Sequence, residues 1–264
     1  MTFSRWQLLN VAMRSFLLQA SWNYNHMMNM GFLYSISPCL DVIYEAGPER
    51  EEAYLRHFEY FNTNPYFSSI VMGVTLKLEE KLHNKEEGIT PELIHTAKEN
   101  LMTSLAAVGD GLFWDNWRPY VAVFAIALAC GNILLTPFIF LLLYNVLHLY
   151  LRFAGVFWGY EQGVGVSRHL KKYNFPHIRE TLRMGTLTLL TYLIPNYINI
   201  HTPYLVGKWS FEAYLYGEKL VQGLVAIPLV ALGVYACRQR VNVLLISFLL
   251  IIVALVFNHW DILI

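Results

Sequence analysis

The chain has 264 residues, of which 56% are apolar and 14% are charged. Soluble globular domains usually carry about 25% charged residues, so this deficit excludes an ordinary soluble domain and indicates a protein embedded in lipid. Lysine plus arginine and aspartate plus glutamate number 19 each, and this balance argues against a nucleic-acid-binding protein.

The first segment, MTFSRWQLLNVAMRSFLLQASW, predicts an amphipathic helix. It does not read as a signal peptide, because it lacks a compact apolar core and a small-residue cleavage site. Arg5 and Arg14 can reach lipid headgroups from the polar side of such a helix. The apolar side carries Trp6, Leu9, Ala12, Met13, Phe16 and Leu17.

Two charged segments predict helices that face water. Residues 45–57, EAGPEREEAYLRH, contain a turn at Gly47 and then a charged helix start. Residues 77–100, KLEEKLHNKEEGITPELIHTAKEN, alternate charges at helical spacing and break at Gly88 and Pro91. Part of the first half of the chain is therefore expected outside the lipid.

Between these segments lies a turn motif, NTNP (62–65). Its Asn and Thr residues cap a helix start, and Pro65 fits the first turn of that helix. The apolar runs at 66–76 and 101–114 are too short to cross a membrane. We expect both runs to be re-entrant or interfacial.

The longest apolar run, residues 120–158, holds a single charge, Arg152. One membrane span takes about 20 residues. Gly131 and Pro137 break the run near its middle. It therefore predicts two passes, or one pass and a broken hairpin.

Three further apolar runs follow. Residues 187–200 are a weaker candidate span, interrupted by Pro195, whereas residues 220–237 and 241–257 are strong candidates. Together with the earlier runs they predict an all-α integral membrane protein. Its N-terminal half would hold amphipathic and re-entrant helices, and its C-terminal half several transmembrane helices.

Positive charge orients this arrangement. Residues 152–183 carry six bases and two acids, and Arg238 and Arg240 follow the run at 220–237. If residues 120–158 cross twice and the runs at 187–200, 220–237 and 241–257 once each, these basic stretches fall on the same side as residues 1–118. Basic loops face the cytoplasm, so that side is expected to be cytoplasmic.

The segment GDGLFWDNWRP (109–119) places two carboxylates, Asp110 and Asp115, directly before the longest apolar run. Its two glycines make an uninterrupted helix doubtful, and a broken element at membrane depth lines a cavity or packs on protein. Carboxylates in such a break can accept hydrogen bonds from sugar hydroxyls. Alternatively, the acids face water and the tryptophans form an interfacial belt. The residues alone leave both interpretations open.

Several motifs occur in one order over nearly the whole chain: SFLLQASWNY (15–24), HFEYFNTNPYFSSIVMGVTLKLEEK (57–81), LMTSLAAVGDGLFWDNWRP (101–119), Gly131–Asn132 and LYLRFAGVFWGYEQGVG. In these motifs the sequence resembles the IID component of the mannose/fructose/sorbose class of bacterial sugar phosphotransferase systems. The resemblance makes residues 1–264 a single IID domain. Its residues 1–118 would be amphipathic or re-entrant and face the cytoplasm, and residues 119–264 would be transmembrane.

The resemblance implies a multi-pass subunit of the bacterial cytoplasmic (inner) membrane. With a second membrane chain, IIC, it would form the path for a hexose or amino sugar, in an assembly of IIC–IID pairs. A cytoplasmic IIB protein would carry the phosphoryl group on a histidine and phosphorylate the sugar during uptake. We therefore expect a non-catalytic subunit of a transferase complex, with no cofactor and no metal ion.

The resemblance favours a functional break at residues 109–119 over a headgroup belt. Asn62 and Asn64 are more often turn residues than ligands, and Glu79–Glu80 more often part of a solvated helix face. The resulting hypothesis names substrate or gate residues, turn residues and interface anchors. The substrate or gate residues are Asp110, Asn62, Asn64 and Glu80. The turn residues are Gly109, Gly111 and Pro65, and the interface anchors are Arg118, Trp114 and Trp117.

Departures from the family pattern leave the sugar open. Asn64 stands where the family usually has histidine, Gly111 where it often has serine, and Asp115 where a small residue is more usual. The alternative function is a membrane scaffold or receptor subunit without a direct role in transport.

Overall fold

The computed structural model of the chain describes residues 3–129 and 134–197, together with four isolated positions, Tyr235, Gln239, Phe248 and Ile252. Apart from two isolated bridges at Met27, the regular structure of these residues is helical, as predicted. The strong candidate spans at 220–237 and 241–257 lie outside the continuously described ranges.

The elements follow one another as α1 (Arg5–Arg14), η1 (Ser15–Leu17), α2 (Asn29–Ile43), α3 (Pro48–His57), α4 (Ser68–His83), α5 (Pro91–Leu112), η2 (Phe113–Trp117), α6 (Arg118–Leu128), α7 (Thr136–Gln162), η3 (Gly163–Gly165), α8 (Val166–Lys171) and α9 (Phe175–Tyr197). The chain divides into two compact units, Met1–Met184 and Gly185–Ile264. The packing and sites described below belong to the first unit. The division at residue 118 stays a prediction about the membrane.

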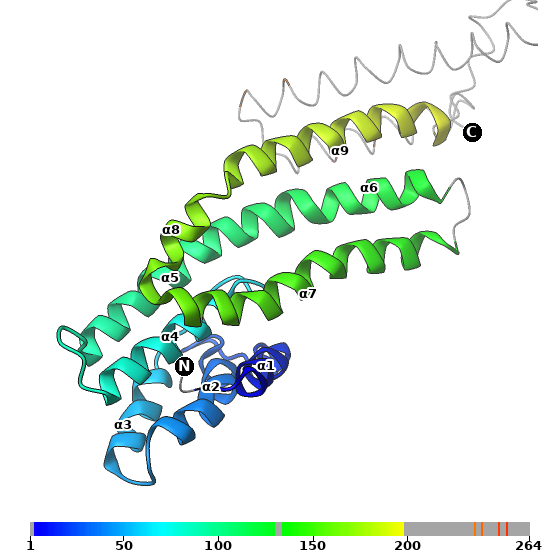
Figure 1. Cartoon of the computed structure of the whole chain (residues 1–264). Coiled ribbons are helices and arrows are strands. Elements are labelled where there is room, and N and C mark those ends of the chain that lie inside the picture. Colours follow the sequence, from blue (N-terminus) through cyan, green and yellow to red (C-terminus); the bar gives the residue numbers. More distant parts are fainter. Residues whose placement is uncertain are drawn as a thin grey trace, which may run out of the picture. The chain divides into compact units, whose positions relative to one another are not determined.

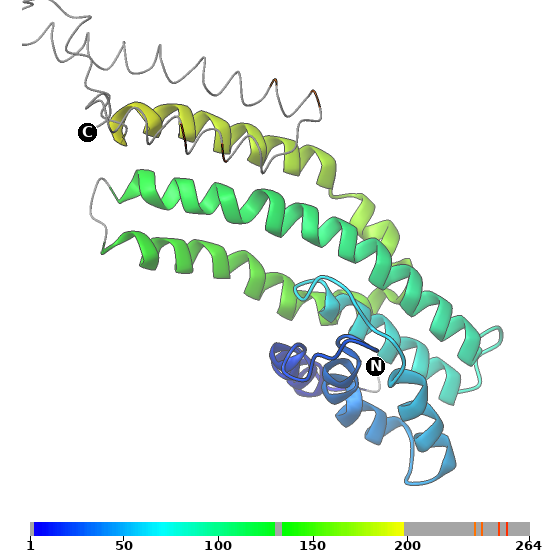
Figure 2. The ribbon, with the colours of Figure 1, turned by 180° about the vertical axis from the view of Figure 1, so that it is seen from behind.

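The centre of the first unit is α4, which lies against α7 (Figures 1 and 2). Glycines let the two backbones approach closely. A Cβ on Gly73 would overlap the backbone of Val156, and a Cβ on Gly159 would overlap that of Ile70. The apolar run predicted at 66–76 as re-entrant or interfacial is thus enclosed by protein, because small residues admit a neighbouring helix.

Turn chemistry predicted most element boundaries correctly. Helix α3 begins at Pro48, directly after Gly47. Helix α4 ends at His83, and α5 begins at Pro91 after the Thr90 side chain accepts a hydrogen bond from the Leu93 backbone N–H. Gly88 in the connection has a φ of 80°, a conformation that glycine adopts without steric cost.

The start of α4 differs from the prediction. The helix begins at Ser68, so Pro65 precedes its first turn and lies in a separate turn at residues 65–67. The backbone N–H groups of Phe67 and Ser68 donate to the carbonyl of Asn64. The NTNP motif therefore makes a turn before the helix and does not supply its N-cap, which is Phe67.

The amphipathic N-terminal helix is present, and it is apolar on two sides. Leu8 and Val11 are buried in the first unit. Most of the apolar face predicted from the sequence remains exposed: Trp6 is 81% exposed and Met13 57%. Two residues of that face are covered, since Ala12 is fully buried and Leu9 is half-buried. The exposed side therefore offers an apolar surface to lipid or protein.

The run at 120–158 folds into two helices, α6 and α7, which lie side by side (Figures 1 and 2). Among the described residues, the helical stretch Thr136–Arg168 is long and apolar enough to cross a membrane. Its first half exposes large apolar side chains, including Phe138 (70%) and Leu142 (67%). The weaker candidate at 187–200 falls, as far as Tyr197, within the longer helix α9.

Candidate functional site

The NTNP turn and α5 meet through one polar pair. Asn64 is 1% exposed, and its Nδ2 donates a 2.9 Å hydrogen bond to Oδ1 of Asp110. The Asn64 Oδ1 accepts from the Tyr66 backbone N–H at 3.0 Å, which closes a turn on the asparagine side chain. Because Asn64 is fixed on both sides, it holds the exposed Asp110 carboxylate in one orientation.

A second bond fastens the same turn. The buried Thr63 donates its Oγ1 hydrogen to the Met102 carbonyl at 2.8 Å, two turns earlier on α5 than Asp110. Asn62 is half-buried, and its side chain makes no hydrogen bond to the described part of the chain. Asn64 thus reaches Asp110, whereas Asn62 belongs to the turn without touching it.

The turn expected at Gly109 and Gly111 is absent. Helix α5 runs through both glycines and continues into η2, a π-helix, and then α6. The glycines serve close packing: a Cβ on Gly109 would overlap the Asn64 side chain, and one on Gly111 would meet the guanidinium of Arg179. A turn and a close contact both select glycine, so the sequence did not distinguish them.

The π-helix spans Phe113–Trp117, within the segment that was predicted to break. The Asn116 side chain donates to the Gly111 carbonyl at 2.5 Å, which occupies an acceptor that the wider turn leaves available. Single π-turns inside α-helices occur frequently at functional sites. The helix is thus irregular directly after Asp110, although it does not break.

The three predicted interface anchors have different surroundings. Trp114 is 39% exposed and lies 5.6 Å from the Tyr66 ring, and Arg118 is exposed at the start of α6. Trp117 is half-buried and lies 6.2 Å from the Tyr120 ring. Its indole N–H is buried without an acceptor among the described residues. Trp114 and Arg118 can meet an interface, whereas Trp117 is largely covered.

Sequence reasoning missed the role of Arg152. It is 4% exposed, and its Nη2 donates to the Pro65 carbonyl at 3.1 Å. Its Nη1 donates to the Ser15 carbonyl, and the guanidinium lies 4.7 Å from the Phe16 ring centre. Arg152 therefore ties α7 to the NTNP turn and to the end of the N-terminal helix. Its isolation as the only charge in residues 120–158 was the available signal.

Two more α7 side chains face the same turn. Tyr144 and Tyr66 share a hydrogen bond between their hydroxyl oxygens, 2.8 Å apart. The His148 ring lies 4.2 Å from the Tyr66 ring and 6.0 Å from Phe16. The His148 ring therefore packs against protein side chains, as a histidine within an apolar run requires.

The prediction of a solvated face at Glu79–Glu80 is wrong, because both side chains are buried. Glu80 Oε2 accepts hydrogen bonds from Tyr160 Oη at 2.7 Å and Lys77 Nζ at 2.9 Å. Glu80 stands twelve residues after Ser68, about 18 Å along α4. The structure therefore does not bring Glu80 to the Asn64–Asp110 pair.

Glu79 is the centre of a separate buried cluster. It accepts hydrogen bonds from His57 Nε2 at 2.7 Å, Arg56 Nε at 2.9 Å and Tyr44 Oη at 2.7 Å. Burial opposes the charged carboxylate, but the hydrogen bonds from His57 and Arg56 and the positive charge of Arg56 outweigh it and hold the pKa of Glu79 at about 2. Burial lowers the pKa of His57, so the imidazole is neutral at pH 7 and Arg56 carries the ion pair. The cluster joins α2, α3 and α4.

Comparison with known proteins gives the family. The family described as "PTS system mannose/fructose/sorbose family IID component" matches residues 2–263. The chain belongs to this family of IID components. The expected resemblance is confirmed, and the chain is a component of a sugar transporter that works with other subunits of the phosphotransferase system.

Characterised relatives of this IID chain differ in the sugar that they name. It is 31% identical to the mannose-specific EIID component of Escherichia coli, over 88% of this chain and 85% of that protein. It is 29% identical to the fructose permease IID component of Bacillus subtilis, over 91% and 90%. The sorbose-specific EIID component of Klebsiella pneumoniae is 28% identical, over 92% and 91%.

Two solved structures are similar in fold and sequence. One, described as a membrane protein, has a TM-score of 0.80 and 28% identity, covering 98% of each chain. The other is a chain of the mannose transporter ManYZ in complex with a microcin, with a TM-score of 0.58 and 28% identity over 99% of this chain and 98% of that one. The IID chain is therefore a membrane protein.

Proposed function

We propose that this IID chain forms, together with a IIC subunit, the translocation path for a hexose or amino sugar that IIB phosphorylates during uptake. The chain itself holds no phosphoryl group in this proposal. It lies in the bacterial inner membrane, crosses it several times, and assembles as IIC–IID pairs. Family membership and the membrane-transporter neighbours support this assignment.

The observation that carries the proposal is the Asn64–Asp110 pair. A carboxylate that is exposed yet held by a buried amide can accept hydrogen bonds from sugar hydroxyls without first being ordered. Trp114, four residues further along, offers a partly exposed aromatic face beside Tyr66. A carboxylate and an aromatic face at the start of α6, beside the apolar helix α7, suit a sugar that leaves a membrane path.

The proposal narrows the predicted set of substrate or gate residues. Asp110 is the group that contacts the sugar or closes the path, and Asn64 positions it. Asn62 adds a polar surface to the same turn. Glu80, buried and bonded to Tyr160 and Lys77, supports the packing of α4 on α7.

The first experiment is phosphoenolpyruvate-dependent sugar phosphorylation by membranes that contain this chain, with and without its IIC subunit. Phosphorylated IIB is supplied, and mannose, glucose, fructose, sorbose, N-acetylgalactosamine and galactosamine are compared. Activity only with both membrane chains supports a shared path and identifies the sugar. No activity on any sugar, with both chains folded, favours the alternative of a scaffold or receptor subunit.

The second experiment tests the site. Asp110→Asn keeps an oxygen acceptor for Asn64 but removes the charge, so we expect assembly to persist and uptake to fall about tenfold, the loss of one charge-assisted hydrogen bond. Asp115→Asn is the matched control, since Asp115 is exposed five residues later and makes no ion pair within the described chain. Full uptake by Asp110→Asn would exclude the site role.

A further inference from the structure

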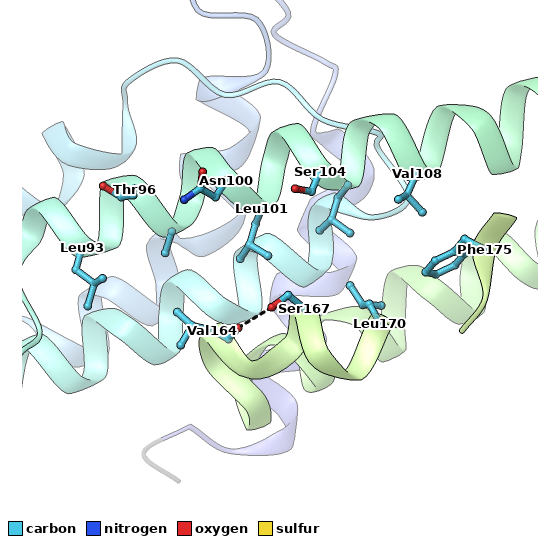
Figure 3. A pocket seen from close by; sticks show the side chains of 12 residues that line it. Leu93, Thr96, Asn100, Leu101, Ser104, Val108, Val164, Ser167, Leu170 and Phe175 are labelled. Atoms are coloured by element: carbon cyan, nitrogen blue, oxygen red, sulfur yellow. Dashed lines mark hydrogen bonds between the residues drawn. The ribbon is translucent and has the colours of Figure 1, made fainter. Parts of the chain in front are cut away.

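A groove of about 550 Å³ lies between α5 and the segment that follows α7 (Figure 3). Leu101, Leu105 and Val108 line it from α5, and Leu170 and Phe175 line it from the opposite side. The hydroxyl of Ser167, which also reaches the groove, donates to the Val164 carbonyl at 3.2 Å, as the dashed line shows. The groove therefore offers mainly apolar contact.

The size of the groove suits one acyl chain. Its α5 wall extends from Leu93 to Val108, about 22 Å along a helix axis. The hydrocarbon core of a bilayer is about 30 Å thick and two chains deep, so one chain extends about 15 Å. The volume lies within the range of small-molecule sites.

The groove also lies next to the long apolar helices. One wall, η3 with α8, directly continues α7, and the stretch Thr136–Arg168 has 33 residues, more than the 20 or so that a span needs. The other wall, α5, continues through η2 into α6. The groove residues Val164 and Ser167 belong to this membrane-length stretch itself. The opposite end of the groove, at Val108 and Phe175, is where α5 approaches η2 and α9 begins.

A guanidinium lies at this end. Arg179 follows Phe175 by one turn of α9 and lies over Gly111, one turn after Val108; a Cβ on Gly111 would be 2.5 Å from its Nη1. Arg179 is only partly exposed and makes no hydrogen bond or ion pair within the described chain. The neighbouring Glu180 does not neutralise it, because Glu180 pairs with Arg183 at 2.8 Å.

We propose that this groove binds an anionic glycerophospholipid, with its phosphate on Arg179 and one acyl chain along α5. A guanidinium matches the planar geometry of phosphate and forms two parallel hydrogen bonds with it. Basic pockets beside transmembrane helices on the cytoplasmic side suit anionic headgroups. Arg168 and Lys172, exposed and unpaired in the described structure, add positive charge on the α8 side.

The test uses the purified complex of this chain with its membrane partner in detergent. Phosphatidylglycerol or phosphatidylcholine with a photoreactive group at the end of one acyl chain is added and irradiated, and labelled peptides are located by mass spectrometry. We expect phosphatidylglycerol to label residues 93–108 about tenfold more than phosphatidylcholine, and Arg179→Ala to remove this preference. Arg183→Ala, which removes the same charge from a paired residue, is expected to keep it.

Two further variants separate the groove from a general attraction to positive charge. Ser104→Phe fills the groove and should abolish labelling, whereas Thr103→Phe adds the same ring at an exposed neighbour outside it and should not. Gly111→Ala keeps the charge but displaces the Arg179 guanidinium, and should weaken the preference. Complex yield by size-exclusion chromatography confirms folding, and Arg179→Lys, which keeps the charge, should retain partial preference if Arg179→Ala does not assemble.

Three outcomes would overturn the proposal. The first is labelling of residues 93–108 that is equal for both lipids and insensitive to Arg179→Ala. The second is no labelling of α5 by either lipid. The third is a crosslink from a photoreactive residue at position 101 to a partner polypeptide, which would show that protein fills the groove.

Discussion

Asn64 and Asp110 are joined by a 2.9 Å hydrogen bond across 46 residues of sequence, with the amide buried and the carboxylate exposed. The surroundings of Asn64 fix its amide, and the hydrogen bond in turn fixes the orientation of the Asp110 carboxylate, which remains exposed to water. Such a pair orders a surface carboxylate at little electrostatic cost.

This relationship predicts that Asn64→Ala affects transport more than folding. The exposed Asp110 can be hydrated when its donor is lost, and the expected cost is about 1–2 kcal/mol of unfolding free energy. Uptake should fall about tenfold, because the carboxylate is no longer oriented. Thr63→Val is the matched control: it breaks a buried bond of the same turn without touching Asp110. Equal uptake by the two variants would contradict the positioning role.

Arg152 is expected to be essential for stability. Arg152→Met removes the donors to the Ser15 and Pro65 carbonyls, which are buried acceptors from two different segments. We expect a loss of roughly 2–5 kcal/mol, measured by thermal unfolding of the complex. Arg152→Lys should recover only part of it, since a single ammonium nitrogen lacks the rigid planar fork whose Nη1 and Nη2 reach the Ser15 and Pro65 carbonyls separately. Arg118→Ala removes an exposed base and should change the thermal stability little. An Arg152→Met variant that is as stable as the unmodified chain would contradict a stabilising role of the Arg152 hydrogen bonds.

The contact between α4 and α7 predicts a sharp response to one added methyl group. Gly159→Ala would overlap the Ile70 carbonyl, which is backbone and cannot rotate away. Overpacking of this kind costs about 1–3 kcal/mol, and the melting temperature should fall accordingly. Gly165→Ala is the control six residues later, where a Cβ meets nothing within 4 Å. Equal melting temperatures for the two variants would show that α4 and α7 pack less closely at Gly159 than described.

Glu79 predicts a loss of stability in acid. Its pKa is about 2 in the folded chain against an ordinary 4.5, so its contribution is fully present above pH 4.5 and is lost as pH falls toward 2. The difference corresponds to about 3 kcal/mol. His57, whose pKa burial lowers, acts in the same direction below its ordinary 6.5, because the buried imidazole resists protonation.

The measurement is the melting temperature of the complex between pH 7 and pH 3, for the unmodified chain and Glu79→Gln. The variant should melt lower at pH 7 and lose less on acidification. Glu86→Gln, which removes an exposed glutamate paired with Lys81, supplies the control. Parallel pH profiles for the unmodified chain and Glu79→Gln would exclude a role of this carboxylate in acid stability.

The sequence predicts those parts of the fold that depend on residues close together in the chain. Helix starts at Pro48 and Pro91 and the break between α6 and α7 follow from glycine and proline, which act on their own backbone. The burial of Glu80 depends on Tyr160, 80 residues away, and no local pattern carries that information. Because Lys77 lies one turn before Glu80, the residues were equally consistent with a helix face exposed to water.

The candidate site shows the same division. Asp110 stands out in the sequence because it is a carboxylate beside a long apolar run. Its donor Asn64 could be suspected only as a turn residue, since the hydrogen bond needs the packing of Gly109 on Asn64. Arg152 could be noticed but not placed, because its acceptors are backbone carbonyls, which any sequence supplies.

The π-turn at Phe113–Trp117 joins α5 and α6 into one continuous rod, but it rotates α6 about the rod axis relative to the position that an uninterrupted α-helix would give it. One residue more than the α-helical repeat rotates everything beyond it by about 100° around the axis. The face of α5 that meets Asn64 and the outward face of α6 therefore do not follow one 3.6-residue repeat through both helices. A one-residue deletion here would leave a continuous rod but rotate α6 about its axis, so chain length at this position decides which face of α6 meets α7 while the Asn64–Asp110 site stays unchanged.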